Sequence, residues 1–266
     1  SNDTVRFSLF SKLINPKIRI FYTVHATNTF KNLSKIDVFV NKLMCNKIIA
    51  ISSSVYNEIV ERNVNKNKIE IVYNGIDLSN ISIRKKEHEN INIACVARLI
   101  AKTKGQDILI KSIGIVRNNY PNIKCYLVGD ANNIKDREEL KKLVDDIGLD
   151  NEIVFTGNLD NVPKFLESID IFVLPSRYEG FGLALIEAMA AKIPVIASNI
   201  DGPKEIIKDN KYGTLFESES VEDLAKKIIK VIESNDEIKI EKAYKYVNNN
   251  YSIKEMVNNL SNIYSL

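Results

Sequence analysis

The sequence predicts an α/β fold built on doubly wound parallel sheets, and two observations support this. From residue 91 onward, short β-branched runs alternate with amphipathic stretches, which is typical of βαβ units. The runs are almost continuously apolar, as expected for strands that helices cover on both faces. We predict strands at 91–97, 123–129, 152–157, 170–175, 193–198 and 212–216. We predict helices at 105–119, 136–147, 161–168, 182–191 and 220–234.

The first 80 residues predict a smaller sheet of three parallel strands, which is few for an independent doubly wound domain. No glycine precedes Gly75, although such a fold usually begins with a glycine-rich turn. We therefore expect an incomplete N-terminal domain, with a sheet edge that a second chain would cover. The predicted strands are 18–24, 46–51 and 68–72, and the predicted helices are 5–14, 32–43 and 53–62.

A polar stretch at 78–90 lacks clear periodicity and predicts an interdomain linker. The tail from about 237 is helical in pattern. These features give the expected domain limits: a partial N-terminal domain at 1–80, a linker at 81–90, a C-terminal domain at 91–248 and a C-terminal helix at 249–266.

The composition argues against several classes of function. The 37 Lys and Arg and 34 Asp and Glu are interspersed and leave a net charge of +3, which gives no support to nucleic-acid binding. The three cysteines lack metal-ligand spacing, and with only two histidines a His-rich metal site is not expected. The sequence shows neither a bilayer-spanning apolar run nor a signal-peptide pattern. We read the cysteines as small hydrophobic residues in a reducing cytoplasm.

The stretch 179–187, which reads EGFGLALIE, follows the predicted strand at 170–175 and opens a helix. This is the carboxyl end of a parallel strand, where open α/β sheets bind ligands. Gly180 and Gly182 allow a ligand to approach the backbone closely. The amides from Gly182 to Leu185 are expected to lack helical acceptors and to offer a seat for phosphate.

Two carboxylates belong to this stretch. Glu179 precedes the helix and Glu187 lies on it, so both can reach one cleft, where carboxylates accept hydrogen bonds from sugar hydroxyls. The alternative is an ordinary helix N-terminus with an acidic cap.

A second group of candidate residues follows the first strand of the C-terminal domain. Arg98 comes after that strand, and Lys104 with Gly105 opens the next helix. Two cations at this turn would neutralise a diphosphate and stabilise the charge that develops on a departing phosphate. The alternative is a solvated loop with routine basic residues. No Asp-x-Asp pair, which holds a metal for this purpose in some enzymes, occurs in the sequence, so we expect no metal.

Together the two groups resemble the GT-B-fold retaining glycosyltransferases of family 4. The element RL-x4-KG at 98–105 precedes EGFGLALIE with the separation typical of that family. The resemblance extends over essentially the whole chain. The other matching pieces are YTVHA (22–26), AISSSVYNEI (50–59), VYNGID (72–77), LVGD (127–130), FTGNLDN (155–161) and PVIASNIDGPKEII (194–207).

The resemblance implies a role for each matching residue. The catalytic set would be His25, Glu179, Arg98 and Lys104, with His25 facing the donor sugar and the two cations holding the diphosphate. Glu187 would bind the ribose hydroxyls. The implied donor-binding residues are Arg98, Lys104, Asn158, Leu159, Glu179, Gly180, Phe181, Gly182, Leu183 and Glu187.

The resemblance also implies the reaction. A hexose would move from a nucleotide diphosphate sugar, with UDP favoured over GDP and ADP, to a saccharide or lipid-linked acceptor with retention of configuration. We expect no cofactor, a role in bacterial surface polysaccharide or glycolipid synthesis, and a cytoplasmic location at the inner membrane face with peripheral membrane contact. The main alternative is a GT-B fragment or binding protein that holds a nucleotide sugar without transferring it. A UDP-sugar 2-epimerase or a phosphorylase fits the residues less well.

Overall fold

The computed structural model describes residues 10–12, 14–81, 83, 89–234 and 236–265. The chain divides into two compact units: unit 1 comprises Ser1–Gly75 and Ile253–Leu266, and unit 2 comprises Ile76–Ser252. Each unit is built on a parallel sheet, of three strands in unit 1 and six in unit 2. The predicted fold class is therefore confirmed.

The sheet of unit 2 has the strand order β6-β5-β4-β7-β8-β9, and every pair of neighbours is parallel. The chain first adds strands on one side of β4 and then returns to add the others on its opposite side. The two central strands, β4 and β7, therefore flank the point where the direction of winding reverses, which is where such sheets bind ligands. The strands are β4 (Ile91–Val96), β5 (Ile123–Val128), β6 (Ile153–Gly157), β7 (Ile171–Leu174), β8 (Val195–Ser198) and β9 (Thr214–Phe216).

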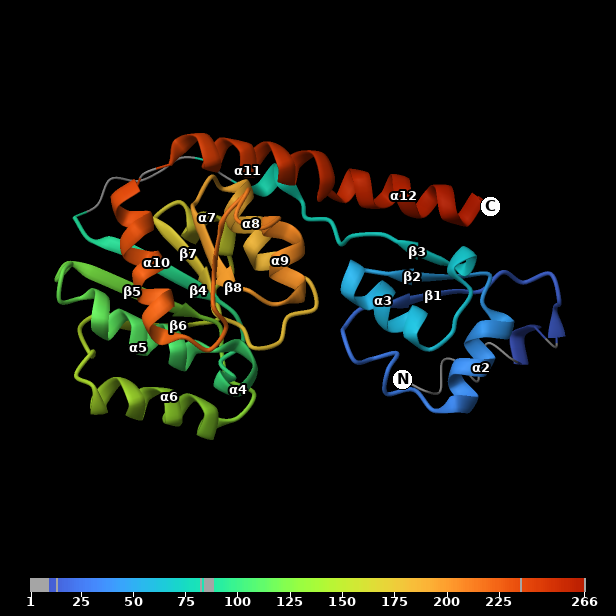
Figure 1. Ribbon diagram of the computed structural model, residues 1–266, viewed down its shortest axis with the longest axis horizontal. Coiled ribbons are helices and arrows are strands. Elements are labelled where there is room, and N and C mark those ends of the chain that lie inside the picture. The colour runs from blue at the N-terminus through green and yellow to red at the C-terminus, as the bar shows by residue number, and fades with distance from the viewer. Residues whose placement is uncertain (1–9, 13, 82, 84–88, 235, 266) are drawn as a thin grey trace. The chain divides into compact units, whose positions relative to one another are not determined.

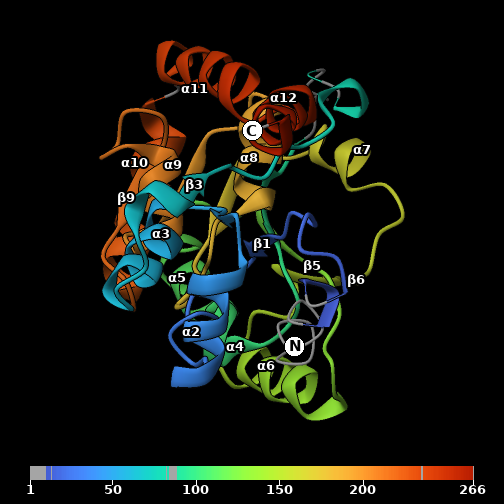
Figure 2. The same ribbon diagram turned by 90° about the vertical axis from the view of Figure 1, so that its right-hand side faces the viewer.

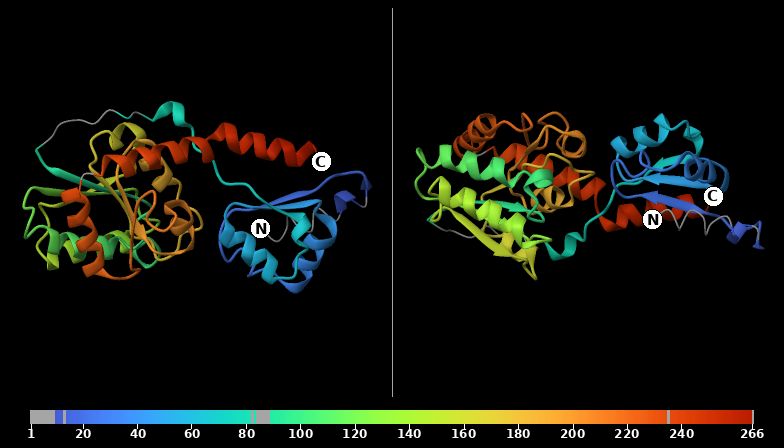
Figure 3. Two further views of the ribbon diagram at one scale, coloured as in Figure 1. Left: turned by 45° about the horizontal axis from the view of Figure 1, so that its top comes forward. Right: turned by 90° about the horizontal axis from the view of Figure 1, so that it is seen from below.

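Helices cover both faces of this sheet (Figures 1 and 3). One face carries helices α5, α6 and α10, whose apolar residues share a core with the strands. The helices are α4 (Ala101–Lys104), α5 (Gln106–Val116), α6 (Ile134–Asp146), α7 (Val162–Leu166), α8 (Leu183–Ala190), α9 (Asp201–Ile207), α10 (Val221–Ser234) and α11 (Glu237–Asn250).

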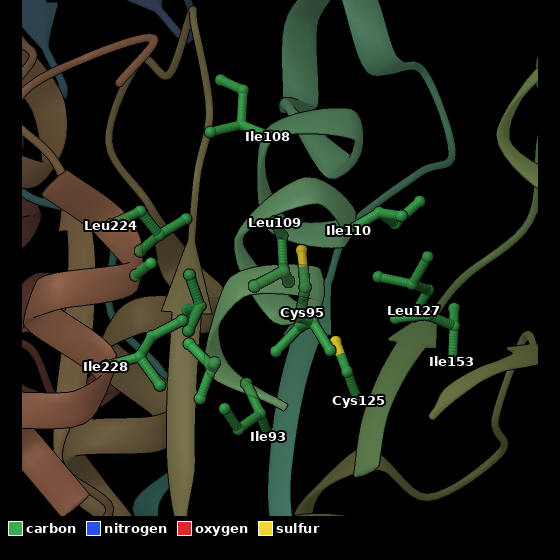
Figure 4. Close-up of a cluster of buried hydrophobic side chains, with 14 of the residues drawn as sticks. Ile93, Cys95, Ile108, Leu109, Ile110, Cys125, Leu127, Ile153, Leu224 and Ile228 are labelled. Atoms are coloured by element: carbon green, nitrogen blue, oxygen red, sulfur yellow. The ribbon is translucent and has the colours of Figure 1, made fainter. Parts of the chain in front are cut away.

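The side chains of the sheet point into this core as the strand pattern predicts. Figure 4 shows Ile93 and Cys95 of β4 beside Leu109 of α5 and Ile228 of α10, all at most 1% exposed. Burying each large apolar side chain contributes about 1.5–3 kcal/mol. This core fixes β4 and the start of α5, and with them the turn between these two elements.

Helix α9 was not predicted. It contains Gly202 and Pro203, both poor helix formers, but proline is tolerated in a first helical turn, where an amide has no helical acceptor. The helix predicted at 105–119 corresponds to α5, but the short helix α4, which ends just before Gly105 at φ +68°, was not predicted.

The sheet of unit 1 has the order β1-β2-β3, also parallel. Helix α12 lies on one side of these strands, and α2 and α3 lie on the other (Figures 1 and 2). Ile263 of α12 packs with Ile49 of β2 and Val72, which closes a small apolar cluster. The elements are β1 (Phe21–Val24), β2 (Lys47–Ala50), β3 (Ile69–Ile71), α2 (Lys35–Met44), α3 (Ser53–Glu61) and α12 (Ile253–Ser265).

The limits of the units differ from the expected domain limits at 80 and 248. Ile76 donates a backbone hydrogen bond to Tyr251 O at 2.8 Å and pairs with Ser252 in a parallel bridge, which ties both stretches to unit 2. Most of the predicted helix at 5–14 and of the predicted linker at 81–90 lies outside the described residues.

Among the described residues, no helix is both long and apolar enough to cross a membrane.

The burial of the three cysteines predicts their reactivity. Burial raises the pKa of Cys45 to about 11 and that of Cys95 to about 12, and Cys125 is shifted upward for the same reason. A thiol reacts as its thiolate. We expect no titratable thiol in the native chain with a disulfide reagent at pH 8, and three per chain in denaturant. Rapid reaction of the folded chain would contradict this packing.

Candidate active site

The candidate cations Arg98 and Lys104 follow β4, and Glu179 follows β7, so they lie on turns at the ends of the two central strands. Gly105, between α4 and α5, brings these turns together. A Cβ added to Gly105 would lie 1.9 Å from Pro175 O, just after β7, so only glycine fits at this contact. Its φ of +68° independently favours glycine. The turn after β4 is thereby held directly against the turn after β7.

This contact places Lys104 opposite Glu179. Lys104 Nζ lies 2.8 Å from Glu179 Oε2, and the two side chains are 20% and 17% exposed. The residues are 75 positions apart in the sequence and meet only because β4 and β7 are neighbours. A predicted cation and a predicted carboxylate thus form one ion pair at the switch point of the sheet.

Arg98 lies on the turn after β4, six residues before Lys104, and it is exposed. Gln106 Nε2 donates to Arg98 O at 2.7 Å, so the backbone of Arg98 is fixed from the first turn of α5. Its guanidinium has no hydrogen bond or ion pair with any residue that the structure describes. Arg98 therefore offers a cation that remains available to an anionic ligand.

The backbone of the EGFG stretch is shaped by two glycines. Gly182 adopts φ +109° and immediately precedes α8. Gly202 of α9 packs against the stretch so closely that an added Cβ would lie 2.5 Å from Glu179 O. The unpredicted helix α9 is therefore part of the frame that holds Glu179 in place.

The N-terminus of α8 offers fewer free amides than expected. Leu185 N donates to Gly182 O at 3.1 Å and so is not available. The amides of Gly182, Leu183 and Ala184 have no acceptor within the described part of the chain. Leu183 is itself exposed, so this helix end can be approached by a ligand.

The ring of Phe181 does not face the site. It is 3% exposed and meets the Tyr251 ring edge-on, with a centroid distance of 5.5 Å. Tyr251 in turn contacts Tyr246, whose hydroxyl lies 3.0 Å from that of Tyr251. Phe181 anchors the loop to α11, and a ligand could contact it only through its backbone.

Glu187 lies on α8 in a half-buried position. Burial raises the pKa of its carboxyl, because a low-dielectric surrounding disfavours the charged form. No described residue forms a hydrogen bond or ion pair with this carboxylate. A hydroxyl donor from a ligand would stabilise this carboxylate by supplying the hydrogen bond that it lacks.

Asn158 and Leu159 follow β6, two strands away from β4 on the same edge of the sheet. Asn158 is exposed and Leu159 is half-buried. The ends of β5 and β6 are joined by a hydrogen bond from Gly129 N to Gly157 O at 2.9 Å. Both residues therefore share the carboxyl edge with Arg98 but lie to one side of the Lys104–Glu179 pair.

His25 belongs to unit 1, where it is exposed directly after β1. The loop that follows it is held by α3. Glu58 accepts hydrogen bonds from Asn28 N at 2.6 Å and Lys31 N at 2.5 Å, and Arg62 donates to Leu33 O at 2.8 Å. The structure thus gives His25 a braced loop within its own unit.

Arg177 is a site-forming residue that the sequence did not reveal. It stands two positions before Glu179, in a part of the pattern where the residue type was left open. Its guanidinium makes a two-pronged contact with Asp107 at 2.7 and 2.9 Å and also contacts Ala101 O at 2.6 Å. Only the folded chain brings these partners together.

Within the described ranges, no group of three or more His, Cys, Asp or Glu is arranged to hold a metal ion. A hollow of about 410 Å³ lies beside α4, α5 and α6, bordered by Lys102, Glu139 and Arg177. The Lys104–Glu179 pair does not line it.

Comparison with known families agrees with this geometry. The family described as "Glycosyl transferases group 1" matches residues 79–252, and "Glycosyltransferase Family 4" matches residues 4–80. This chain belongs to the group 1 glycosyltransferases. It is a glycosyltransferase of the GT-B fold, and the residues matched by the two families follow the two units closely.

Individual relatives of this glycosyltransferase extend over most of its length. It is 31% identical to an uncharacterised glycosyltransferase of Methanocaldococcus jannaschii, over 99% of this chain and 72% of that protein. It is 31% identical to the capsular polysaccharide biosynthesis glycosyltransferase CapM of Staphylococcus aureus, over 71% of this chain and 52% of that protein. Among solved structures it resembles Anabaena HepE in complex with UDP, with a TM-score of 0.88 at 20% identity, over 100% of this chain and 77% of that one.

The close contact at Gly105 predicts that adding a side chain at this position destabilises unit 2. Gly105→Ala should destabilise unit 2 by more than about 2 kcal/mol, because it adds a backbone clash to an unfavourable φ. Gly114→Ala is the matched control, since its Cβ would meet only Leu149 Cδ1 at 3.7 Å within α5, and it should be neutral or mildly stabilising. Denaturant unfolding measures both. Equal stability of the two variants would contradict the close approach at Pro175.

The raised pKa of Glu187 predicts a pH-dependent gain in stability on its removal. The folded chain holds the proton of Glu187 more tightly than the unfolded chain, so the buried charge destabilises the fold at neutral pH. Glu187→Gln should therefore raise Tm at pH 7 in the absence of ligand. The gain should shrink as the pH falls through the raised value and vanish below the ordinary 4.5. A variant less stable than wild type at pH 7 would show that Glu187 has a stabilising partner.

Proposed function

We propose that this glycosyltransferase moves a hexose from a UDP-sugar to a saccharide or lipid-linked acceptor, with retention of anomeric configuration. We place the activity in the synthesis of a bacterial surface polysaccharide or glycolipid. The observation that supports this best is the Lys104–Glu179 pair of 2.8 Å at the switch point of the unit 2 sheet.

The electrostatic arrangement suits a nucleotide diphosphate. Arg98 provides an available guanidinium, Lys104 provides an ammonium, and the N-terminus of α8 provides backbone amides. These donors come from the turns after β4 and β7, where a diphosphate would bind in an open parallel sheet. They can stabilise the negative charge of a departing diphosphate from the protein side.

Glu179 suits the sugar end of the same ligand. Its Oε2 is paired with Lys104, while Oε1 has no partner among the described residues and can accept a hydrogen bond from a sugar hydroxyl. Glu187 would take the ribose hydroxyls, which would provide its carboxylate with the donors that the folded chain lacks. Asn158 and Leu159, farther along the same edge, would lie near the base.

The choice of UDP rests on similar structures. Anabaena HepE has been solved with UDP and with UDP-glucose, and both structures resemble this chain in fold. CapM, named for capsular polysaccharide biosynthesis, supports the assignment to surface polysaccharide synthesis.

We propose front-face substitution as the mechanism. The bond between the anomeric carbon and the diphosphate oxygen breaks, and the acceptor hydroxyl attacks the same face. The departing phosphate oxygen takes the proton of that hydroxyl, so charge and protons balance. Arg98 and Lys104 stabilise the leaving group, and Glu179 orients the sugar. His25 of unit 1 is assigned to the donor sugar, through the family pattern.

A thermal-shift panel tests the donor. UDP-glucose, UDP-galactose, UDP-N-acetylglucosamine, GDP-mannose and ADP-glucose are compared at the same concentration. A ligand at a hundred times its Kd stabilises the native state by about 2.7 kcal/mol, which gives a clear increase in Tm. We expect the increase with a UDP-sugar. No shift with any of the five, or a shift with GDP-mannose alone, would contradict the proposed donor.

Two variants separate the roles of the pair. Lys104→Ala should raise the Kd for UDP and slow transfer. Glu179→Gln should slow transfer by about 10²-fold or more, because an interaction with the reacting sugar is lost. It should leave the Kd for UDP unchanged or lower it, because Lys104 is then free of its carboxylate. Calorimetry with UDP and a transfer assay measure both effects. Parallel losses of UDP binding and transfer in Glu179→Gln would contradict a role at the sugar.

The stereochemistry of the product tests the proposed retention. NMR of the anomeric proton in a purified product should show the configuration of the donor. A product of inverted configuration would exclude front-face substitution.

A further inference from the structure

Arg177 contacts one short segment through both its side chain and its backbone, and two carboxylates hold its guanidinium. The segment is α4, four residues long, which ends at Lys104. A helix this short has little stability of its own, and α4 also lacks a side-chain N-cap. The direction in which Lys104 points must therefore be set by contacts from elsewhere in the fold.

Arg177 supplies those contacts at both ends of α4. Its Nη1 donates to Ala101 O, at the start of α4, at 2.6 Å. Its backbone amide and that of Tyr178 both donate to Thr103 O, at 2.9 and 3.2 Å, one residue before Lys104. The side chain and the backbone of one residue thus hold the segment that carries Lys104.

The same guanidinium is itself held by two carboxylates. Asp107, in the first turn of α5, accepts from Nη1 and Nη2 at 2.7 and 2.9 Å. Glu219 accepts from Nε at 3.0 Å, but its side chain is 61% exposed, so Asp107 is the stronger partner. The hydrogen bonds to Asp107 are also the main cause of the raised pKa of Arg177. The guanidinium makes two bonds to Asp107 and also meets Ala101 O and Glu219, which needs more N–H donors than the three of an ammonium.

We propose that Arg177, held by Asp107, is a positioning residue for the donor diphosphate: it sets Lys104 against Glu179 and does not itself touch the ligand. Its place in the chain, two residues before Glu179, makes it the direct link between the two turns of the site. This inference rests on the function proposed above, in that Lys104 binds the diphosphate.

A double-mutant cycle tests the positioning role. Arg177→Lys keeps the charge but loses the two-pronged contact. It should raise the Kd for UDP about tenfold in the wild-type background and less than twofold in the Lys104→Ala background, because its effect acts through Lys104. Asp107→Asn should also raise the Kd for UDP. It replaces Arg177→Lys in the cycle if that variant does not fold.

Arg117→Lys is the matched control. Arg117 also holds backbone carbonyls of unit 2, those of Ile147 and Gly148, but does so at the far end of α5. It should lower Tm without changing the Kd for UDP. If Arg177→Lys only destabilised the fold, it would likewise lower Tm and leave the Kd for UDP unchanged. An equal increase of Kd in both backgrounds, or none in either, would overturn the proposal.

A crystal structure of Arg177→Lys without ligand provides a second, independent readout. We expect the distance from Lys104 Nζ to Glu179 Oε2, 2.8 Å in the wild-type chain, to exceed 4 Å or the side chain of Lys104 to adopt several conformations. An undisturbed pair would overturn the positioning role. Failure of the wild-type chain to bind UDP would instead count against the proposed function and leave this structural test in force.

Discussion

The contact between Gly105 and the carbonyl of Pro175 is the constraint on which the rest of the site depends. The two residues belong to the turns after β4 and β7, and the absence of a side chain at Gly105 lets these turns touch. Lys104 lies immediately before this contact, and Glu179 follows it by four residues. The backbone of Gly105 lies so close to Pro175 O that the two turns can shift little relative to each other. The contact therefore defines the spacing between the cation and the carboxylate.

The two cations near this contact differ in whether they already have a partner. Lys104 is already neutralised by Glu179, whereas the guanidinium of Arg98 has no partner among the described residues. In the function proposed above, a diphosphate would bind Arg98 and compete with Glu179 for Lys104. The ion pair keeps two partly buried charges compensated while no ligand is bound, since an isolated buried charge would be costly. Binding of the diphosphate and release of Glu179 toward the sugar would thereby be coupled.

The strands and most helices of unit 2 were predictable because each is encoded locally. The alternation of apolar runs and amphipathic stretches locates β4 to β9 to within a few residues. Helix α9 escaped prediction because Gly202 and Pro203 are poor helix formers, yet the close packing of Gly202 on Glu179 O requires that glycine. The packing of the Phe181 ring against Tyr251, a residue 70 positions later in the chain, was also not predicted. Such long-range packing leaves no local sequence signal.

The sequence by itself determined the type of sheet, the positions of its strands and the residues that follow β4 and β7. It also carried the family pattern, because the residues that form that pattern are consecutive or nearly so. Only the tertiary structure decided that Lys104 pairs with Glu179, that Arg98 stays available, and that Arg177 links the two turns through Asp107. The physical reason is the strand order. Parallel winding makes β4 and β7 neighbours across more than 70 residues of sequence, and contacts over that separation depend on how the elements pack and not on any local pattern.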